Sequence, residues 1–464
     1  MKSVRSAALS IGLSFTLLAA LPVQAAPAYG TYLHPFAADS LWNSQPVNPV
    51  LGDFQIPKSS YFPTVAAGGY STGVFLAKPE DPPVTIVGLP GKQGVWDPDA
   101  EAWRSAITLP RWPAVIPVSG SDGHAEVIDE QLGVIHSFWQ LRNDNGTWRA
   151  AQYAWTRLDG RGWGDPANYF QGARATGVPS SAGLIRKHEI DDGDTQYRHA
   201  LAMSLTYNGL AAKPSYVFPA TSADSGAETQ NTGKIPEGAL LMLPKDFHID
   251  NITTPKLRKV ARTLMTYGAY VVDRNVGTPF VIYVETGSSY SLHPTGWNGT
   301  AAQELEWIRG HLRQVVSVES FRGADDVCFK PHQRLNLLAL RGTWSRRSGG
   351  NATAAYDSTQ RALVVSASPQ ATTLQNTSNR LVSPVDWSKP KAGTTYDLKV
   401  KASGGASLRV DILSGGKVVY STGDLTDGQQ ATFPWPAANF TAVGYVTTVA
   451  GQAAVVSGSL MARP

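Results

Sequence analysis

Residues 125–157 read AEVIDEQLGVIHSFWQLRNDNGTWRAAQYAWTR, and this stretch decides the fold class. Its apolar and β-branched residues fall into three runs with strand character, at 125–129, 134–142 and 147–157. Asn145-Gly146 between the last two runs is a strong hairpin signal, because both residues tolerate positive φ. The stretch therefore predicts three consecutive antiparallel strands.

Short strand-like runs continue on both sides of this meander, at 84–87, 105–109 and 197–207. Residues 269–273 and 280–285 flank a turn and predict a further hairpin. Two segments instead have helical spacing. The first begins at Pro255 after Thr254 and stops at Gly268, and the second covers 300–315. The fold expected for residues 26–343 is mainly β, an antiparallel sandwich or jelly-roll-like domain with a few helices.

The composition changes near residue 345, where 345–351 resembles a linker. Beyond it, alternating runs separated by Gly-rich turns lie at 362–366, 396–401, 407–413 and 417–420. We expect residues 344–464 to form a small β-sandwich that binds carbohydrate.

The first 25 residues have the features of a cleavable signal peptide. Lys2 and Arg5 precede an apolar run at 7–21, and Val23-Gln24-Ala25 supplies a cleavage site. The run is shorter than the roughly 20 residues that a membrane span needs. The sequence thus predicts a secreted or periplasmic protein without a membrane anchor.

Composition excludes several classes of protein. Among 464 residues, 40 Lys and Arg face 36 Asp and Glu, a balance unlike that of a nucleic-acid binder. One cysteine, Cys328, permits neither an internal disulfide nor a cysteine metal site. We expect no metal and a monomer. The 13 Trp and 17 Tyr suggest aromatic surface suited to sugars.

The meander carries the first group of candidate site residues. Alternation along its first strand places His124 and Glu126 on one face, with Asp129 on the other. Tyr153 and Trp155 share a face of the third run. Carbohydrate sites typically combine acid/base groups with flat aromatic rings that pack against the sugar. Trp139 on the second run is a further candidate for substrate binding.

The second group lies in 186–199, which reads RKHEIDDGDTQYRH. Glu189 and His199 are its candidate catalytic residues, and Arg198 is its candidate substrate ligand. Asp191-Asp192-Gly193-Asp194 suggests a calcium site, although the spacing fits no EF-hand and a solvated turn is favoured.

The segment around this second group resembles a pattern found in secreted bacterial proteins of unknown activity. The pattern is an Ala-Gly-Leu-type turn, an arginine, Glu-Ile, a glycine, His-Ala-Leu and a later Tyr-Gly with an aspartate. The residues that carry the resemblance are Ala182-Gly183-Leu184-Ile185-Arg186, Glu189-Ile190, Gly193, His199-Ala200-Leu201, Tyr267-Gly268 and Asp273. The resemblance implies that this segment forms part of a functional site. It implies no particular activity.

Three functions remain open. A glycoside hydrolase needs two carboxylates, which Glu189 with Asp129 or Glu126 could supply. A polysaccharide lyase needs a base and cations, which His124 or His199 with a tyrosine and Arg198 could supply. A non-catalytic polysaccharide-binding or matrix protein would use the same aromatics. The number of acids favours the hydrolase. Every version assumes that the meander and 186–199 line one groove.

Overall fold

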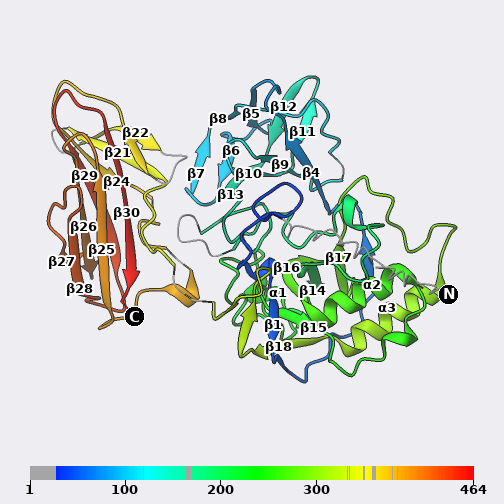
Figure 1. Ribbon diagram of the computed structural model, residues 1–464. Coiled ribbons are helices and arrows are strands. Elements are labelled where there is room, and N and C mark those ends of the chain that lie inside the picture. The colour runs from blue at the N-terminus through cyan, green and yellow to red at the C-terminus, as the bar shows by residue number, and fades with distance from the viewer. Residues whose placement is uncertain are drawn as a thin grey trace, which may run out of the picture.

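The computed structural model describes residues 28–463 except 119, 164–168, 332, 334, 349–350, 358–361, 379 and 384. The predicted signal peptide lies outside the described residues. The chain forms two parts, a larger one built on several sheets and a C-terminal sandwich beside it (Figure 1). The predicted mainly β class is confirmed.

The predicted meander forms the centre of a six-stranded sheet. β9, β10 and β13 pair antiparallel, with Ser137 opposite both Glu126 and Ala154. Neighbouring strands extend the sheet on both sides, in the order β4 (Thr72–Ala77), β9 (His124–Asp129), β10 (Val134–Trp139), β13 (Gln152–Arg157), β6 (Val95–Asp97) and β7 (Ala102–Arg104). β4 runs parallel to β9, and the sequence contains no signal for such parallel pairs.

The second and third predicted runs each divide into two strands. Asn145 and Gly146 have the positive φ that the hairpin turn requires. The strands flanking them join a separate four-stranded sheet, in the order β11 (Arg142–Asp144), β12 (Thr147–Ala150), β5 (Val84–Gly88) and β8 (Ala106–Leu109).

A seven-stranded sheet holds the other half of the larger part. Its order is β2 (Val50–Leu51), β18 (Arg313–Ser317), β15 (Leu240–Met242), β16 (Ala269–Asn275), β14 (Leu201–Thr206), β17 (Phe280–Tyr283) and β3 (Thr64–Ala66). The predicted β16–β17 hairpin is wrong, because β14 lies between these two strands and pairs with both. All six residues of β14 are buried, so it can occupy a sheet centre.

The two predicted helices are present and cover one face of this sheet. α2 (Pro255–Thr266) has Pro at its start as predicted, and the Glu304 carboxylate accepts from the amides of Thr253 and Thr254 ahead of it. α3 (Gly299–His311) is capped by Asn298 and ends before Val315, which belongs to β18. No described helix has the length and apolarity to cross a membrane.

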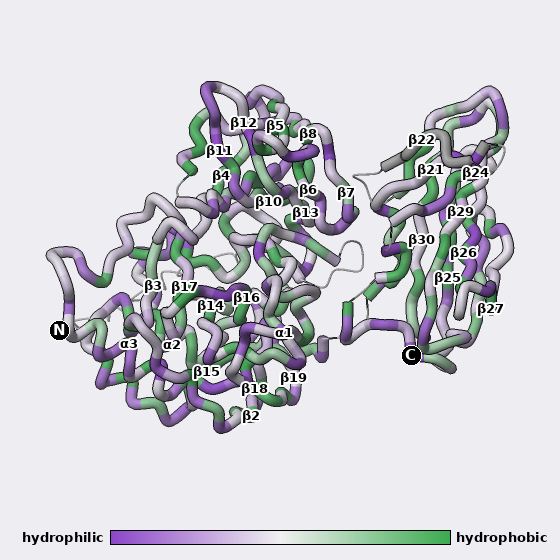
Figure 2. Tube along the Cα trace, turned by 180° about the vertical axis from the view of Figure 1, so that it is seen from behind, coloured by the Kyte–Doolittle hydropathy of each residue, from purple (hydrophilic) through white to green (hydrophobic). Residues whose placement is uncertain are grey.

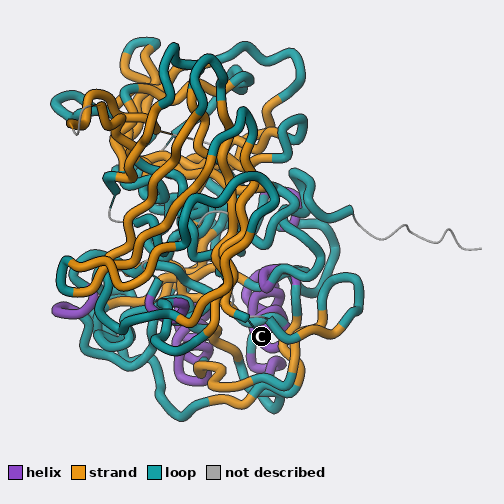
Figure 3. Tube along the Cα trace, turned by 90° about the vertical axis from the view of Figure 1, so that its left-hand side faces the viewer, coloured by secondary structure: helices purple, strands orange, loops and turns teal. Residues whose placement is uncertain are grey.

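Three short helical turns and a small sheet complete the larger part. The turns are η1 (Leu41–Asn43), η2 (Lys187–Glu189) and η3 (Ile249–Asn251), and α1 (Ala227–Gln230) is a single turn of α-helix. The small sheet has the order β1 (Gln45–Val47), β19 (Ser320–Arg322) and β20 (Cys328–Phe329). Figure 3 shows the main helices gathered toward one end of the molecule.

Three apolar cores stack between the layers of the larger part. Leu201, Met203 and Leu205 of β14 join the core under α2 and α3. Ala202 points the other way, into a core that includes Ile128 of β9. Val127 of β9 joins the third core, which lies on the opposite face of the six-stranded sheet. Alternation along β9 and β14 therefore decides which core each side chain enters.

The C-terminal part is the predicted sandwich. One sheet has the order β22 (Asn351–Asp357), β21 (Thr343–Ser348), β24 (Thr372–Asn376), β29 (Thr441–Thr448), β26 (Ser407–Ser414) and β27 (Lys417–Ser421). The other has the order β23 (Leu363–Val365), β30 (Ala454–Ala462), β25 (Thr395–Ala402) and β28 (Gln430–Pro434), and the turn η4 (Asp386–Ser388) lies outside both sheets.

The boundary between the two parts differs from the one that composition indicated. The linker-like stretch belongs mostly to β21, and the core of the sandwich already includes Leu335, Leu337, Leu338 and Leu340. It also includes Tyr169 from the larger part. Figure 2 shows the sandwich beside the larger part, with β7 and β22 near the boundary.

Candidate functional site

The register of the meander separates the residues expected to share one groove. Glu126, Ser137 and Ala154 lie side by side on one face of the six-stranded sheet. His136 pairs with Trp155, so Trp155 lies on the opposite face. Tyr153 belongs to that opposite face too, because it joins the core of Val127. His124 and Glu126 are thus divided from Tyr153 and Trp155 by the sheet itself.

His124 and Glu126 are interior residues. Glu126 is fully buried, and its carboxylate accepts from the Ser137 hydroxyl at 2.5 Å and from the amides of Ser180 and Ser181 at 2.5 and 3.0 Å. Burial raises the pKa of Glu126 and lowers that of His124 well below its usual range. These side chains hold the loop at Ser180 against β9, and substrate cannot reach Glu126.

Asp129, Tyr153 and Trp155 belong to another region. Arg111 donates to both oxygens of Asp129, at 2.9 and 3.0 Å, and both groups lie close to His136. Tyr153 and Trp155 line a cleft with His136. Asp129 therefore serves an ion pair on the far face and does not accompany Glu189.

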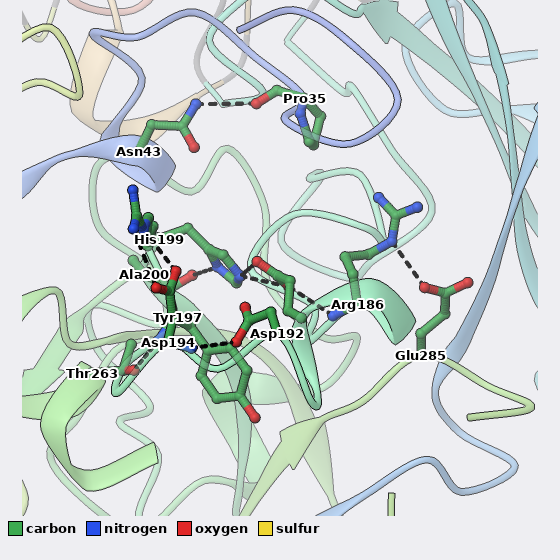
Figure 4. Close-up of polar contacts among 12 residues, drawn as sticks. Pro35, Asn43, Arg186, Asp192, Asp194, Tyr197, His199, Ala200, Thr263 and Glu285 are labelled. Atoms are coloured by element: carbon green, nitrogen blue, oxygen red, sulfur yellow. Dashed lines mark hydrogen bonds and ion pairs between the residues drawn. The ribbon is translucent and has the colours of Figure 1, made fainter. Parts of the chain in front are cut away.

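Glu189 and His199 do meet, in a small pocket at the end of η2. His199 Nε2 lies 3.1 Å from Glu189 Oε1, and Nδ1 lies 2.8 Å from the Ala200 carbonyl oxygen. Figure 4 shows His199 beside Arg186, which extends to Glu285. Arg198 lines the same pocket with His34 and Asn43. Glu189 and His199 of the second predicted group thus contact each other, and Arg198 lines the same pocket.

The electrostatics of this pair favour two opposite charges. Burial raises the pKa of Glu189, but the charge and hydrogen bond of His199 and the Arg186 amide outweigh it and bring the value to about 2. Burial lowers the pKa of His199, but Glu189 and the Ala200 carbonyl outweigh it and raise the value overall. The pair therefore favours the imidazolium–carboxylate form.

This arrangement limits the chemistry of the pocket. Both ring nitrogens of His199 are occupied, so the ring has no lone pair for a substrate proton. No second carboxylate is found among the described residues that line the pocket. His34 is different, because burial lowers its pKa despite the opposing charge of Glu189, and it is neutral at pH 7.

The acidic stretch after Ile190 is used for ion pairs. Asp192 binds Lys259 Nζ at 2.5 Å, and Asp194 binds Arg198 at 2.8 Å. No group of three or more potential metal-ligating side chains occurs in the described part of the chain. The calcium suggestion gains no support from these contacts.

A second site, built from carboxyl groups, lies at the C-terminal part of β16. Asp224 Oδ2 accepts from the Arg274 backbone N–H at 2.9 Å, and Asp273 Oδ1 accepts from the same N–H at 3.1 Å. Arg174 donates to Asp273 Oδ2 at 3.0 Å. The side chains of Asp224 and Asp273 are 20% and 19% exposed, so both can be reached from solvent.

The two carboxyl groups have different environments. Burial, followed by the charge of Asp273, raises the pKa of Asp224 to about 7. Asp273 instead forms an ion pair with Arg174, whose side chain is 2% exposed. Beneath them lies Glu237, which is fully buried, and burial with the charge of Asp224 raises its pKa well above the usual range. Asp224, with its pKa raised to about 7, thus lies beside a carboxyl group that is paired with Arg174.

Aromatic and acidic groups from both large sheets and from the turn before β9 lie near this carboxyl pair. The Arg174 guanidinium lies over the Tyr283 ring at 4.1 Å. Burial and the charge of Asp273 raise the pKa of Asp122, which a hydrogen bond from Trp139 opposes. Of the predicted substrate-binding residues, Trp139 is therefore the one near this pair.

Sequence reasoning missed this pair, because its members are far apart in the chain and only tertiary structure unites them. Asp273 did appear in the resemblance pattern. For Asp224 the available signal was its position in the polar loop SADSG.

No family model and no curated protein sequence matches this chain. Among solved structures, one described as "CBM4 structure and function" aligns with 26% of this chain and 94% of its own length, at 16% identity and a TM-score of 0.17. A likeness at this level supports no conclusion about function.

Proposed function

We propose that the protein is a secreted polysaccharide-degrading enzyme, a glycoside hydrolase that uses Asp224 and Asp273. The observation that carries the proposal is the shared N–H of Arg274, which places an acid with a pKa of about 7 beside the Arg174-paired carboxyl group of Asp273. Glycosidases use two carboxyl groups, one protonated and one ionised.

The roles follow from the environments of the two groups. Asp224 is the general acid that protonates the leaving oxygen. Asp273 is the base or nucleophile, oriented by the Arg174 guanidinium and by the Arg274 amide. Trp139 supplies a ring against which a sugar can stack. Glu237 positions Asp224 by accepting from its backbone N–H at 3.2 Å.

The experiment is incubation of the full mature chain with neutral and uronate-containing polysaccharides. We expect new reducing ends without the ultraviolet absorbance of an unsaturated uronate. Asp224→Asn and Asp273→Asn should each lower the rate by about 10²–10⁴-fold. Asp194→Asn, at a surface ion pair, should leave it unchanged.

Glu189→Gln separates this proposal from the one that the sequence favours. If Glu189→Gln abolished the rate and Asp224→Asn left it intact, the reaction would belong to the Glu189–His199 pocket. A polysaccharide lyase is the second candidate there, because neutral His34 shares that pocket with Arg198. Appearance of unsaturated uronate, lost in His34→Gln, would establish that alternative. Binding without any cleavage would indicate a matrix or lectin-like protein.

A further inference from the structure

The cleft on the far face of the six-stranded sheet has features of a second ligand site. Its volume is about 860 Å³, within the range of about 300–1,000 Å³ that is typical of ligand pockets. Its walls come from β8, β10 and β13 and from Ala362 of the C-terminal sandwich. We call it the His136 cleft.

His136 is a buried residue, and one of its two ring nitrogens has no hydrogen-bond partner. The side chain is 6% exposed, and Nδ1 lies 2.9 Å from the Tyr153 hydroxyl. Nε2 is buried and has no hydrogen-bond partner. Burial lowers the pKa of His136 to about 4 and raises that of Tyr153, so the imidazole is neutral and the phenol keeps its proton. With Tyr153 donating to Nδ1, the ring proton lies on Nε2, a buried donor of a residue that lines the cleft.

Two arginines contribute to the lining of the cleft, and Asp97 acts on Tyr153 from nearby. Arg104 and Arg157 line the cleft, and none of its described lining residues is Asp or Glu. Arg157 also pairs with Asp159, and Asp129 behind His136 is neutralised by Arg111. An unsatisfied N–H donor among guanidinium groups favours an anionic acceptor.

The remaining lining favours a sugar over a bare anion. Trp155 and Tyr153 contribute ring surface, and Leu132 at the rim is 50% exposed. Flat rings and aliphatic groups pack against the C–H faces of a pyranose. We propose that the His136 cleft binds a carboxylate-bearing sugar unit, a uronate, of the polymer. This rests on the proposed function only in naming the polymer as substrate.

The test is calorimetric binding of a galacturonate hexamer to the full mature chain, with the fully methyl-esterified hexamer as matched ligand. We expect the acidic hexamer to bind about tenfold or more tightly than its ester. His136→Phe and Arg104→Gln should each weaken the acidic hexamer about tenfold. Arg322→Gln, at an exposed arginine on β19, should not.

Two further variants keep the test decisive. Leu132→Glu adds a negative charge at an exposed rim position without touching the core, and it should weaken the acid but not the ester. All titrations use the Asp224→Asn background, which prevents cleavage of the hexamer, so loss of catalysis and loss of this cleft are distinguishable. Equal affinity for acid and ester would overturn the proposal. So would unchanged affinity in Leu132→Glu together with unchanged affinity in Arg104→Gln.

Discussion

At the scale of single residues, function depends on which carboxyl groups share an environment. Asp224 and Asp273 bind one N–H, whereas Asp129 and Glu126 are each satisfied elsewhere by Arg111 or by Ser180 and Ser181. Two acids close together cannot both ionise easily, and Asp273 has the closer arginine, with Arg174 at 3.0 Å, while Arg274 lies 3.8 Å from Asp224. Because their environments differ, Asp224 is suited to act as the acid and Asp273 as the base or nucleophile.

The raised pKa of Asp224 predicts the alkaline side of the pH–rate profile. The general acid must carry its proton, so the rate should fall as the pH rises through about 7. Measurement of kcat/KM between about pH 5 and pH 9, about two units on either side of neutrality, checks this. Asp194→Asn should keep the same profile. An alkaline limb that persists in the residual activity of Asp224→Asn would contradict the assignment.

The Glu189–His199 pair predicts a window of stabilisation. The pKa of Glu189 falls from 4.5 to about 2, so its contribution is present above pH 4.5 and is lost as the pH falls toward 2. The pKa of His199 rises above 6.5, so its contribution is complete below that pH and is lost as the pH rises through the folded value. The pair should therefore stabilise the fold most between pH 4.5 and 6.5.

Urea unfolding of wild type and Glu189→Gln across pH measures this window. The difference in free energy of unfolding should reach about 1–3 kcal/mol inside it and shrink on both sides. Glu228→Gln, at the exposed 3.9 Å pair with Lys213, is the control and should show almost no difference. A difference that does not change with pH would assign Glu189 a purely steric role.

At the scale of elements, the turn after α2 sets where β16 enters the sheet. Gly268 has a φ of +77°, and a Cβ there would lie 2.6 Å from the Leu241 carbonyl oxygen on β15. The sequence predicted the stop at Gly268, but the close approach of β15 is visible only in the structure. A side chain at this position would displace β16, the strand that carries Asp273.

Gly268→Ala should consequently destabilise the protein by about 1–3 kcal/mol and lower activity through Asp273. Gly310→Ala in α3 is the matched control. Nothing lies within 4 Å of its added Cβ, so it should leave stability unchanged or raise it by up to about 1 kcal/mol. Thermal unfolding midpoints check both variants. Equal unfolding midpoints for Gly268→Ala and Gly310→Ala would show that β15 shifts to accommodate the new methyl group without loss of stability.

At the scale of the whole molecule, the two parts share buried contacts. Arg341 bridges Asp97 and Asp99 of the larger part, and all three side chains are at most 4% exposed. Trp387 of the sandwich donates to the Ala220 carbonyl at 2.6 Å and packs edge-on against Phe218. The sequence suggested independent domains, whereas these contacts couple them.

Arg341→Ala should cost about 3–5 kcal/mol, because it leaves two buried carboxylates without their cation. Calorimetry of the wild type should show one cooperative transition, and the variant should show two. Arg142→Ala removes an exposed pair with Asp144 and should change little. Two transitions already present in the wild type would mean that the sandwich and the larger part unfold independently.

Local sequence was sufficient for elements whose signals lie within a few residues. Asn145-Gly146 permits the turn by its tolerance of positive φ, and Pro255 and Gly268 mark the ends of α2. Alternation along β9 correctly separated Glu126 from Asp129. The contact of Glu189 with His199 was also within reach, because both lie on one short loop beside a strand.

Only the tertiary structure could decide what meets across strands and layers. The register of β10 puts Trp155 on the face away from Glu126, and β14 enters between β16 and β17, which no local pattern encodes. Asp224 lies in a loop and Asp273 in β16. They come together because both carboxyl groups accept from the backbone N–H of Arg274. Short-range propensities act along the chain, while burial and hydrogen bonding between distant segments choose the partners that complete a site.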